Sequence, residues 1–98
     1  MKNYKDENLD ILFKAVMSLE SLEECYAFFD DLCTVTELKS LAQRFEVARL
    51  LDEKCVYTDI AEKTGASSAT ISRVNRALLY GSSGYKGVID KMKGKENE

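Results

Sequence analysis

The sequence predicts an all-α fold, and three observations lead to that prediction. The 98-residue chain contains no proline, its apolar residues recur with the period of amphipathic helices, and no segment sustains the alternation of a half-buried strand. Apolar side chains make up 45% of the residues and charged ones 32%, which is typical of one small folded domain. We therefore expect residues 1–95 to form a single helical domain, with a disordered tail over residues 94–98.

Three helices are expected between residues 8 and 53, and their starts carry recognisable signals. The first helix is expected to end near Leu19. Ser21–Glu24 and Thr34–Glu37 both have the spacing of a capping box, in which a hydroxyl and a carboxylate three residues apart satisfy backbone N–H groups. The second helix begins at the first of these boxes, and the third is expected over residues 35–53.

These helices carry more large apolar side chains than a chain of this length easily buries, because small domains bury a smaller fraction of their surface. Tyr26, Phe28 and Phe29 fall within one helical turn and cover most of its circumference. Such a helix suits a position between two subunits. We therefore predict that residues 8–53 are the dimerisation helices of a homodimer; a tightly packed monomer core is the alternative.

Residues 57–76, YTDIAEKTGASSATISRVNR, match the packing demands of a helix-turn-helix. Thr58 is the expected cap of the first helix, Ile60 is expected to point inward, and the small Ala61 lets the second helix cross closely. Gly65 is expected to adopt a left-handed conformation in the turn, since glycine has no Cβ penalty there.

The second helix of this pair is expected to begin with Ser67 or Ser68 as its cap and to pack Ile71 and Val74 back onto Ile60. Its outward residues are small near the amino terminus and cationic further along. They are Ser68, Ala69, Thr70, Ser72, Arg73 and Arg76. Small residues let a helix end approach base edges in the major groove, and arginines bind phosphate or guanine. A plain packing motif is the alternative.

The charge distribution favours the DNA interpretation. The net charge of −3 divides into −6 over residues 1–37, −1 over residues 38–62, +6 over residues 63–95 and −2 at the tail. An acidic body with a basic surface that meets phosphates has this pattern, although a solvated face would also produce it.

Several function classes are excluded by composition. The chain has no histidine and only three cysteines, without a CxxC spacing, so neither Ser-His-Asp chemistry nor a zinc site is expected. We expect reduced thiols, no cofactor and no enzymatic activity. No apolar run approaches the length of a membrane span, so we expect a cytoplasmic protein without a membrane partner.

Beyond the helix-turn-helix, residues 81–84, GSSG, are expected to break the helix, and a short helix is expected over residues 85–93. Its predicted buried side is formed by Val88, Ile89 and Met92. Its predicted solvent-exposed lysines are Lys86, Lys91 and Lys93.

Three runs together resemble the core of the Trp repressor superfamily, specifically the small Trp repressor-related proteins of Gram-positive bacteria: residues 33–37 (CTVTE), Gln43–Arg44 and residues 65–73 (GASSATISR). The resemblance covers roughly residues 9–80. It implies an all-helical, intertwined dimer that presents two helix-turn-helix units to successive major grooves. It further implies base reading by Ser68, Ala69, Thr70 and Ser72, with Thr58 and Lys63 contacting the DNA backbone.

The resemblance also implies a ligand pocket, which maps onto Thr34, Arg44, Thr70 and Arg73. However, Val74 stands where the family pocket has a glycine, and Ala77 stands where a serine binds the ligand's amino group. These departures argue against a tryptophan corepressor. A different small-molecule effector is left open, and structural salt bridges are the slightly favoured interpretation of the two arginines.

The sequence as a whole predicts a regulator that binds double-stranded DNA as a dimer at a pseudo-palindromic operator, acting as a repressor. Its predicted DNA-contacting residues are Thr58, Lys63, Ser67, Ser68, Ala69, Thr70, Ser72, Arg73 and Arg76. The alternative is a protein-interaction module that docks a partner from the transcription machinery without touching DNA.

Overall fold

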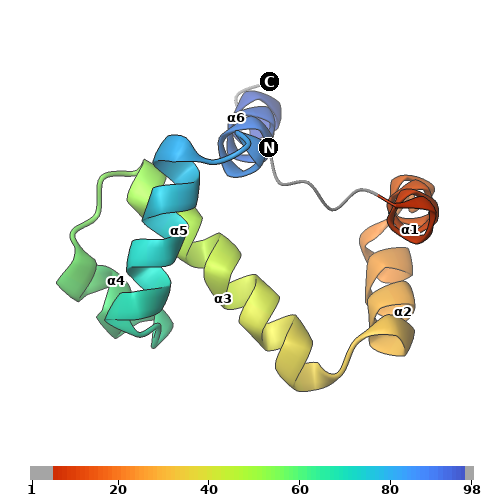
Figure 1. Ribbon diagram of the computed structural model, residues 1–98, viewed down its shortest axis with the longest axis horizontal. Helices are drawn as coiled ribbons and strands as arrows, with labels where there is room; N and C mark the ends of the chain where they lie inside the picture. The colour runs from red at the N-terminus through yellow and green to blue at the C-terminus, as the bar shows by residue number, and fades with distance from the viewer. Residues whose placement is uncertain (1–5, 97–98) are drawn as a thin grey trace. The chain divides into compact units, whose positions relative to one another are not determined.

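The computed structural model describes residues 6–96, and within that range it contains six helices and no strand (Figure 1). The helices are α1 (Glu7–Met17), α2 (Leu22–Leu32), α3 (Val35–Asp52), α4 (Tyr57–Thr64), α5 (Ser68–Tyr80) and α6 (Gly84–Glu96). The all-α prediction is therefore confirmed. Among these six helices, none combines the length and the apolar character that crossing a lipid bilayer requires.

The chain divides into two compact units, Met1–Lys39 and Ser40–Glu98, where the sequence pattern predicted one domain. The physical reason is the distribution of buried side chains. Neither α1 nor α2 contains a buried residue, whereas every buried side chain of the described range lies between residues 47 and 89. The hydrophobic core of a single chain thus belongs to the second unit.

Helices α2 and α3 begin at the expected caps, whereas α1 begins after Asp6, a cap that was not predicted, whose carboxylate accepts the Leu9 N–H at 2.7 Å. The Ser21 hydroxyl accepts the Glu24 N–H at 3.1 Å. At the start of α3 the exchange is reciprocal, because the Glu37 N–H donates to the Thr34 hydroxyl at 3.1 Å and the Thr34 N–H donates to the Glu37 carboxylate at 2.8 Å. This backbone donor also lowers the pKa of Glu37.

The core of the second unit gathers apolar residues from α3 to α6. Its buried members are Val47, Ala48, Leu50, Leu51, Ile60, Ala66, Ile71, Val74 and Ile89. Ile60, Ile71 and Val74 are at most 2% exposed, which confirms that α5 packs its inner face against α4. Burial of each such side chain contributes about 1.5–3 kcal/mol, so the α4–α5 pair is held mainly by these contacts.

The carboxyl end of α3 closes in a Schellman arrangement. The Cys55 N–H donates to the Leu50 carbonyl and the Lys54 N–H donates to the Leu51 carbonyl, both at 3.0 Å. Lys54 takes the left-handed conformation that this closure needs, with φ of 67°. A lysine therefore occupies a position that glycine fills without strain.

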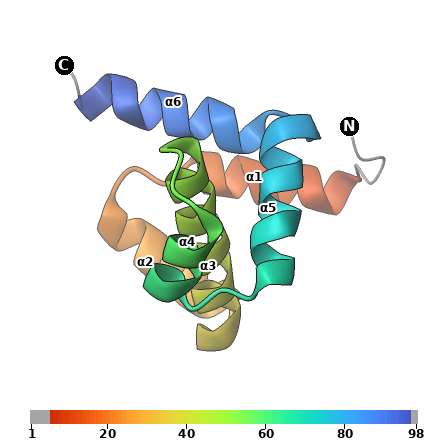
Figure 2. The same ribbon diagram turned by 90° about the vertical axis from the view of Figure 1, so that its left-hand side faces the viewer.

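Helix α6 crosses the carboxyl ends of α3 and α5 (Figure 2) and is bound there by charge as well as by apolar contact. Asp52, at the end of α3, accepts hydrogen bonds from Lys86 at 2.8 Å and Lys93 at 2.6 Å. Of the three apolar residues predicted to be buried, only Ile89 is; Val88 and Met92 are 48% and 42% exposed.

The predicted end of the last helix needs correction. Helix α6 runs from Gly84 to Glu96, so residues 94–96, expected to be disordered, continue the helix. Residues 97–98 of the predicted tail lie outside the described residues. The ion pairs from Lys86 and Lys93 to α3 explain why the helix persists despite its glycines.

Candidate nucleic-acid interface

Helices α4 and α5 are joined by a tight turn built around Gly65. This residue has φ of 74° and ψ of 6°, and its N–H donates to the Ala61 carbonyl at 2.8 Å, which confirms the predicted left-handed conformation. A Cβ at this position would come no closer than 4.0 Å to the Gln43 side chain. Backbone conformation, not lack of space, is therefore what requires glycine here.

Two side chains to which the sequence analysis assigned no role in the turn, Thr64 and Gln43, fix it. The Thr64 hydroxyl donates to the Ile60 carbonyl at 2.7 Å and accepts the Ala66 N–H at 3.1 Å. Gln43 of α3 donates its amide N–H to the Thr64 carbonyl at 3.1 Å. A threonine directly before a turn glycine is a signal that sequence reasoning had available, since hydroxyls often satisfy turn backbone groups.

The two helices begin in different ways. The prediction that Thr58 caps α4 is wrong, because the cap is Val56, which makes no side-chain hydrogen bond, and Thr58 lies inside the first turn. Ser67 caps α5 as expected, and its hydroxyl accepts the Thr70 N–H at 3.1 Å. The two hydroxyls of Ser67 and Thr70 are also hydrogen-bonded to each other at 3.1 Å.

The residues on the outer face of α5 can be deduced from those on its buried inner face. Ile71 and Val74 are buried, so at 100° per residue the opposite sector of the helix is occupied by residues 69, 72, 73, 76 and 80. All five are exposed: Ala69, Ser72, Arg73, Arg76 and Tyr80. The face is thus small and polar toward its amino end and cationic toward its centre.

The nine predicted DNA-contacting residues all lie on α4, α5 or the turn between them. Eight are exposed, and Thr70 is half-buried because it lies at the edge of the inner face. Thr70 therefore departs from the prediction that it points outward. Thr58 and Lys63 are exposed on α4, outside the sector of α5 described above. Tyr80, which is 82% exposed and ends the outer face, was not among the predicted residues.

The electrostatics of this surface are one-sided. The sequence has no acidic residue between Glu62 and Asp90, and α5 itself carries two arginines and no carboxylate. Among the described side chains, those of residues 6–95, Arg73 and Arg76 form no ion pair, whereas Lys86 and Lys93 are paired with Asp52. The charge count of the sequence therefore overstates the positive charge that is open to a partner. Besides the two arginines of α5, the exposed Lys63 of α4 and the exposed Lys91 and Lys95 of α6 have no ion pair among the described side chains.

The four residues of the predicted ligand pocket belong to different units. Thr34 belongs to the first unit, where its hydroxyl serves the cap of α3. Arg44 and Thr70 are half-buried in the second unit, and Arg73 is exposed on the outer face of α5. Val74 is 2% exposed and forms part of the core, so its side chain fills space that a smaller residue would leave open.

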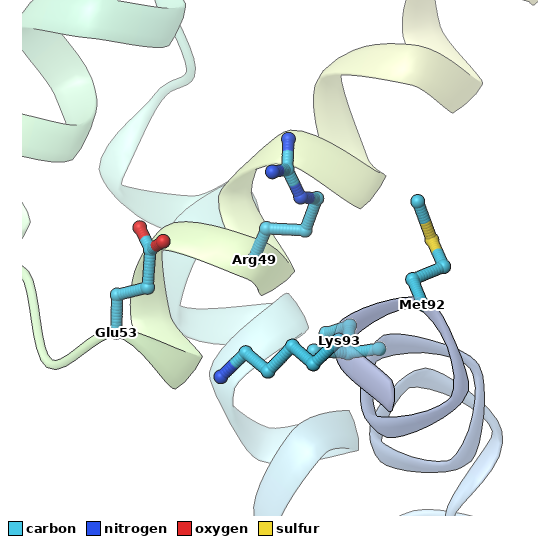
Figure 3. A pocket seen from close by; sticks show the side chains of 5 residues that line it. Arg49, Glu53, Met92 and Lys93 are labelled. Carbon is cyan, nitrogen blue, oxygen red and sulfur yellow. The ribbon is translucent and has the colours of Figure 1, made fainter. Parts of the chain in front are cut away.

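Two hollows in the second unit lie elsewhere. One, of about 50 Å³, lies between α3 and α6 (Figure 3) and is far smaller than the 300–1,000 Å³ typical of ligand sites. It is lined by Arg49, Glu53, Ile89, Met92 and Lys93. The other, of about 400 Å³, is lined by residues of α6 alone: Val88, Lys91, Met92, Gly94 and Lys95. A single helix encloses no ligand, and neither hollow includes Arg44, Thr70 or Arg73.

Comparison with known proteins places this geometry in a family. The sequence pattern of the Trp repressor protein family matches residues 7–93, which is nearly the whole chain. The chain belongs to the Trp repressor family. This family contains regulators and is not an enzyme family, so membership agrees with the function class expected from the sequence.

Relatives of this Trp repressor family member are similar over most of their length. It is 54% identical to the uncharacterized protein YerC of Bacillus subtilis strain 168 over 94 residues, covering 96% of this chain and 90% of YerC. Two solved structures, each with a TM-score of 0.88, match 91% of this chain. One is a TrpR-like protein of Eubacterium eligens, which is 55% identical to this chain and matched over 92% of its own length. The other is a Staphylococcus aureus protein provisionally described as a Trp repressor, which is 48% identical and matched over 89% of its own length.

Proposed function

We propose that this Trp repressor family member is a dimeric, sequence-specific DNA-binding transcriptional regulator, which represses by occupying a pseudo-palindromic operator. The observation that carries the proposal is the outer face of α5, where exposed small residues precede two arginines that have no ion-pair partner among the side chains of residues 6–95. The rigid turn at Gly65 fixes this face relative to α4.

The small residues suit the major groove of duplex DNA. Ala69 and Ser72 have short side chains, so the backbone of α5 approaches base edges closely. A serine hydroxyl both donates and accepts, and the alanine methyl packs against the methyl group of thymine. The Thr70 hydroxyl is already hydrogen-bonded to that of Ser67. Its remaining hydrogen-bonding capacity and the Thr70 methyl group lie at the edge of the same surface.

The arginines and the helix terminus suit phosphate. Arg73 and Arg76 project from the middle of α5, where a guanidinium reaches a backbone phosphate or a guanine. The amino end of α5 adds the partial positive charge of a 13-residue helix. Exposed Thr58 and Lys63 extend the proposed phosphate contacts onto α4.

Dimerisation is supported by the apolar surface of the first unit. Among its large apolar side chains, those at least 60% exposed are Ile11, Met17, Leu22, Tyr26 and Val35. Exposure of this many large apolar side chains is unusual for a soluble monomer, and a second copy would cover them. In such a dimer the two α5 helices would lie about 34 Å apart, so that they enter successive major grooves on one side of the duplex.

The proposed ligand response differs from that of a tryptophan-activated repressor. Val74 occupies core space, and Ala77 has no hydroxyl, so a tryptophan corepressor is not proposed. Arg44 and Arg73 form no ion pair within the described part of a single chain. They are the residues through which an anionic effector of another kind would act.

The test begins with selection of bound fragments from a random DNA pool, followed by mobility-shift titrations at 50 and 200 mM salt. Arg73→Ala and Arg76→Ala should each weaken binding. Removing one phosphate-binding arginine from each of the two subunits should flatten the slope of log affinity against log salt by about 1.8, so that affinity falls roughly tenfold less across this interval. Thr70→Ala should mainly relax base preference at one operator position.

The matched control is Arg49→Ala, which removes the same charge from α3, where Arg49 pairs with Glu46 at 2.8 Å. It should leave operator affinity and salt slope close to those of the native chain. Equal effects of Arg49→Ala and the two α5 variants, or no effect of any, would contradict recognition by α5. The latter result would favour docking of a protein partner.

A further inference from the structure

Asp52 is the hub of an ion-pair cluster between α3 and α6. Its carboxylate oxygens bind Lys86 at 2.8 Å and Lys93 at 2.6 Å, so each oxygen faces its own ammonium group. The Asp52 side chain is only 8% exposed, whereas the two lysines are about half-exposed. Asp90, one turn along α6, adds a second carboxylate to Lys86 at 3.3 Å.

The cations of the second unit therefore differ in whether a carboxylate pairs with them. Lys86 and Lys93, which α6 turns toward α3, are held by carboxylates. Arg73 and Arg76 of α5 have no ion-pair partner among the described side chains, and neither have Lys91 and Lys95 of α6. Without Asp52, Lys86 and Lys93 would join Lys91 and Lys95 as open cations of α6, and this helix would present four lysines against two acidic residues, Asp90 and Glu96. A helix of this composition attracts any polyanion without regard to sequence.

We propose that Asp52 is a specificity-determining residue that shields Lys86 and Lys93 from DNA phosphates and so limits duplex binding outside the α4–α5 surface. The proposal rests on the proposed function, because it concerns which part of the second unit meets DNA. Non-specific affinity for duplex DNA comes almost entirely from charge, whereas specific affinity also uses base contacts. Shielding of lysines that lie outside α5 therefore lowers the non-specific affinity more than the specific affinity.

The position of Asp52 makes it an effective competitor with phosphate. It lies at the carboxyl end of α3, where the helix carbonyls already favour cations. The bonds are intramolecular, so each lysine that turns to a phosphate instead must break its own short charge-assisted hydrogen bond to Asp52. Figure 3 shows Lys93 reaching from α6 toward the end of α3.

Glu53 provides a matched control. It is the next residue along the chain and carries the same charge, but it forms no ion pair within residues 6–96, and its carboxylate points away from Lys93 (Figure 3). Glu53→Gln removes one negative charge and releases no lysine. Asp52→Asn removes one negative charge and releases two.

The experiment measures the binding of full-length variants to a random-sequence duplex by fluorescence anisotropy over a series of salt concentrations. Asp52→Asn should steepen the slope of log affinity against log salt by about 0.9 for each lysine that reaches a phosphate, or up to roughly 1.8 per chain. Glu53→Gln should leave the slope within experimental error. Adding Lys86→Gln and Lys93→Gln to Asp52→Asn should return the slope to its native value.

A second arm does not depend on how well Asp52→Asn folds. In the otherwise native chain, Lys86→Gln with Lys93→Gln should leave the slope on random-sequence duplex unchanged, because shielded lysines contact no phosphate. Equal slopes for Asp52→Asn and Glu53→Gln, or a flatter slope for the double lysine variant, would overturn the proposal. Failure of the proposed function appears separately, as unchanged operator binding in Arg73→Ala and Arg76→Ala.

Discussion

Glycine-to-alanine substitution should have opposite effects on the free energy of unfolding at two sites, the turn between α4 and α5 and the interior of α6. Gly65 has φ of 74° and an added Cβ would have space, so Gly65→Ala costs only the left-handed backbone penalty, about 1–2 kcal/mol. Reduced freedom of the unfolded chain returns about 0.4–1 kcal/mol. The expected net decrease in the free energy of unfolding is about 1 kcal/mol.

Gly87 is the matched control, because it lies inside α6 and an added Cβ meets no atom within 4 Å. Gly87→Ala should raise the free energy of unfolding by about 0.5–1 kcal/mol, since alanine is the better helix former. Urea denaturation followed by circular dichroism measures both, and a change of 1 kcal/mol corresponds to about 4–8 °C in Tm. Changes of the same sign at the two sites would refute the assignment of a conformational requirement to Gly65.

Three further predictions concern caps and charge. The ion pairs to Lys86 and Lys93 lower the pKa of Asp52 from 3.8 to about 2, so this carboxylate stabilises the fold above pH 4 and loses that effect as pH falls toward 2. After allowance for solvent screening of the half-exposed lysines, the loss in the free energy of unfolding is about 1 kcal/mol. The stabilities of the native chain and of Asp52→Asn, measured as the pH is lowered, should therefore converge at low pH. A constant difference between the two curves would contradict this. Lys54→Gly removes a side chain from a left-handed position, so it should raise the free energy of unfolding by about 0.5–1 kcal/mol and with it the urea midpoint. A lowered midpoint would argue against the Schellman closure. Ser67→Ala removes the acceptor of the Thr70 N–H and should cost about 1 kcal/mol of stability, and Ser67→Asp should retain most of it; equal losses would deny Ser67 its capping role.

Local signals predicted local structure well. The caps at Ser21, Thr34 and Ser67 and the left-handed Gly65 each depend on a residue and its immediate neighbours, and all four are observed. The prediction for Thr58 was wrong because a hydroxyl near a helix start does not by itself mark the cap, and Val56 occupies that position without a side-chain bond. Helix starts without a polar cap leave no signal of this kind in the sequence.

Contacts between distant residues were harder to predict. Nothing in the local pattern of α6 shows that Lys86 and Lys93 meet Asp52, which lies 34 and 41 residues earlier in the chain. Gln43 supports the turn at Thr64 across 21 residues in the same way. Periodicity identifies which residues share a helical face, but it does not determine which other element covers that face, as exposed Val88 shows.

These long-range contacts explain how a protein with a net charge of −3 is suited to bind a polyanion. Non-specific attraction depends on total accessible charge, which the acidic first unit and the carboxylate of Asp52 both reduce. Under the proposed function, recognition depends instead on a local field, and α5 would provide one through two arginines on a face without a carboxylate. A low overall charge combined with this cationic face would then lower the affinity for random DNA relative to that for an operator. The ratio of these two affinities decides whether a regulator finds its site among many competing sequences.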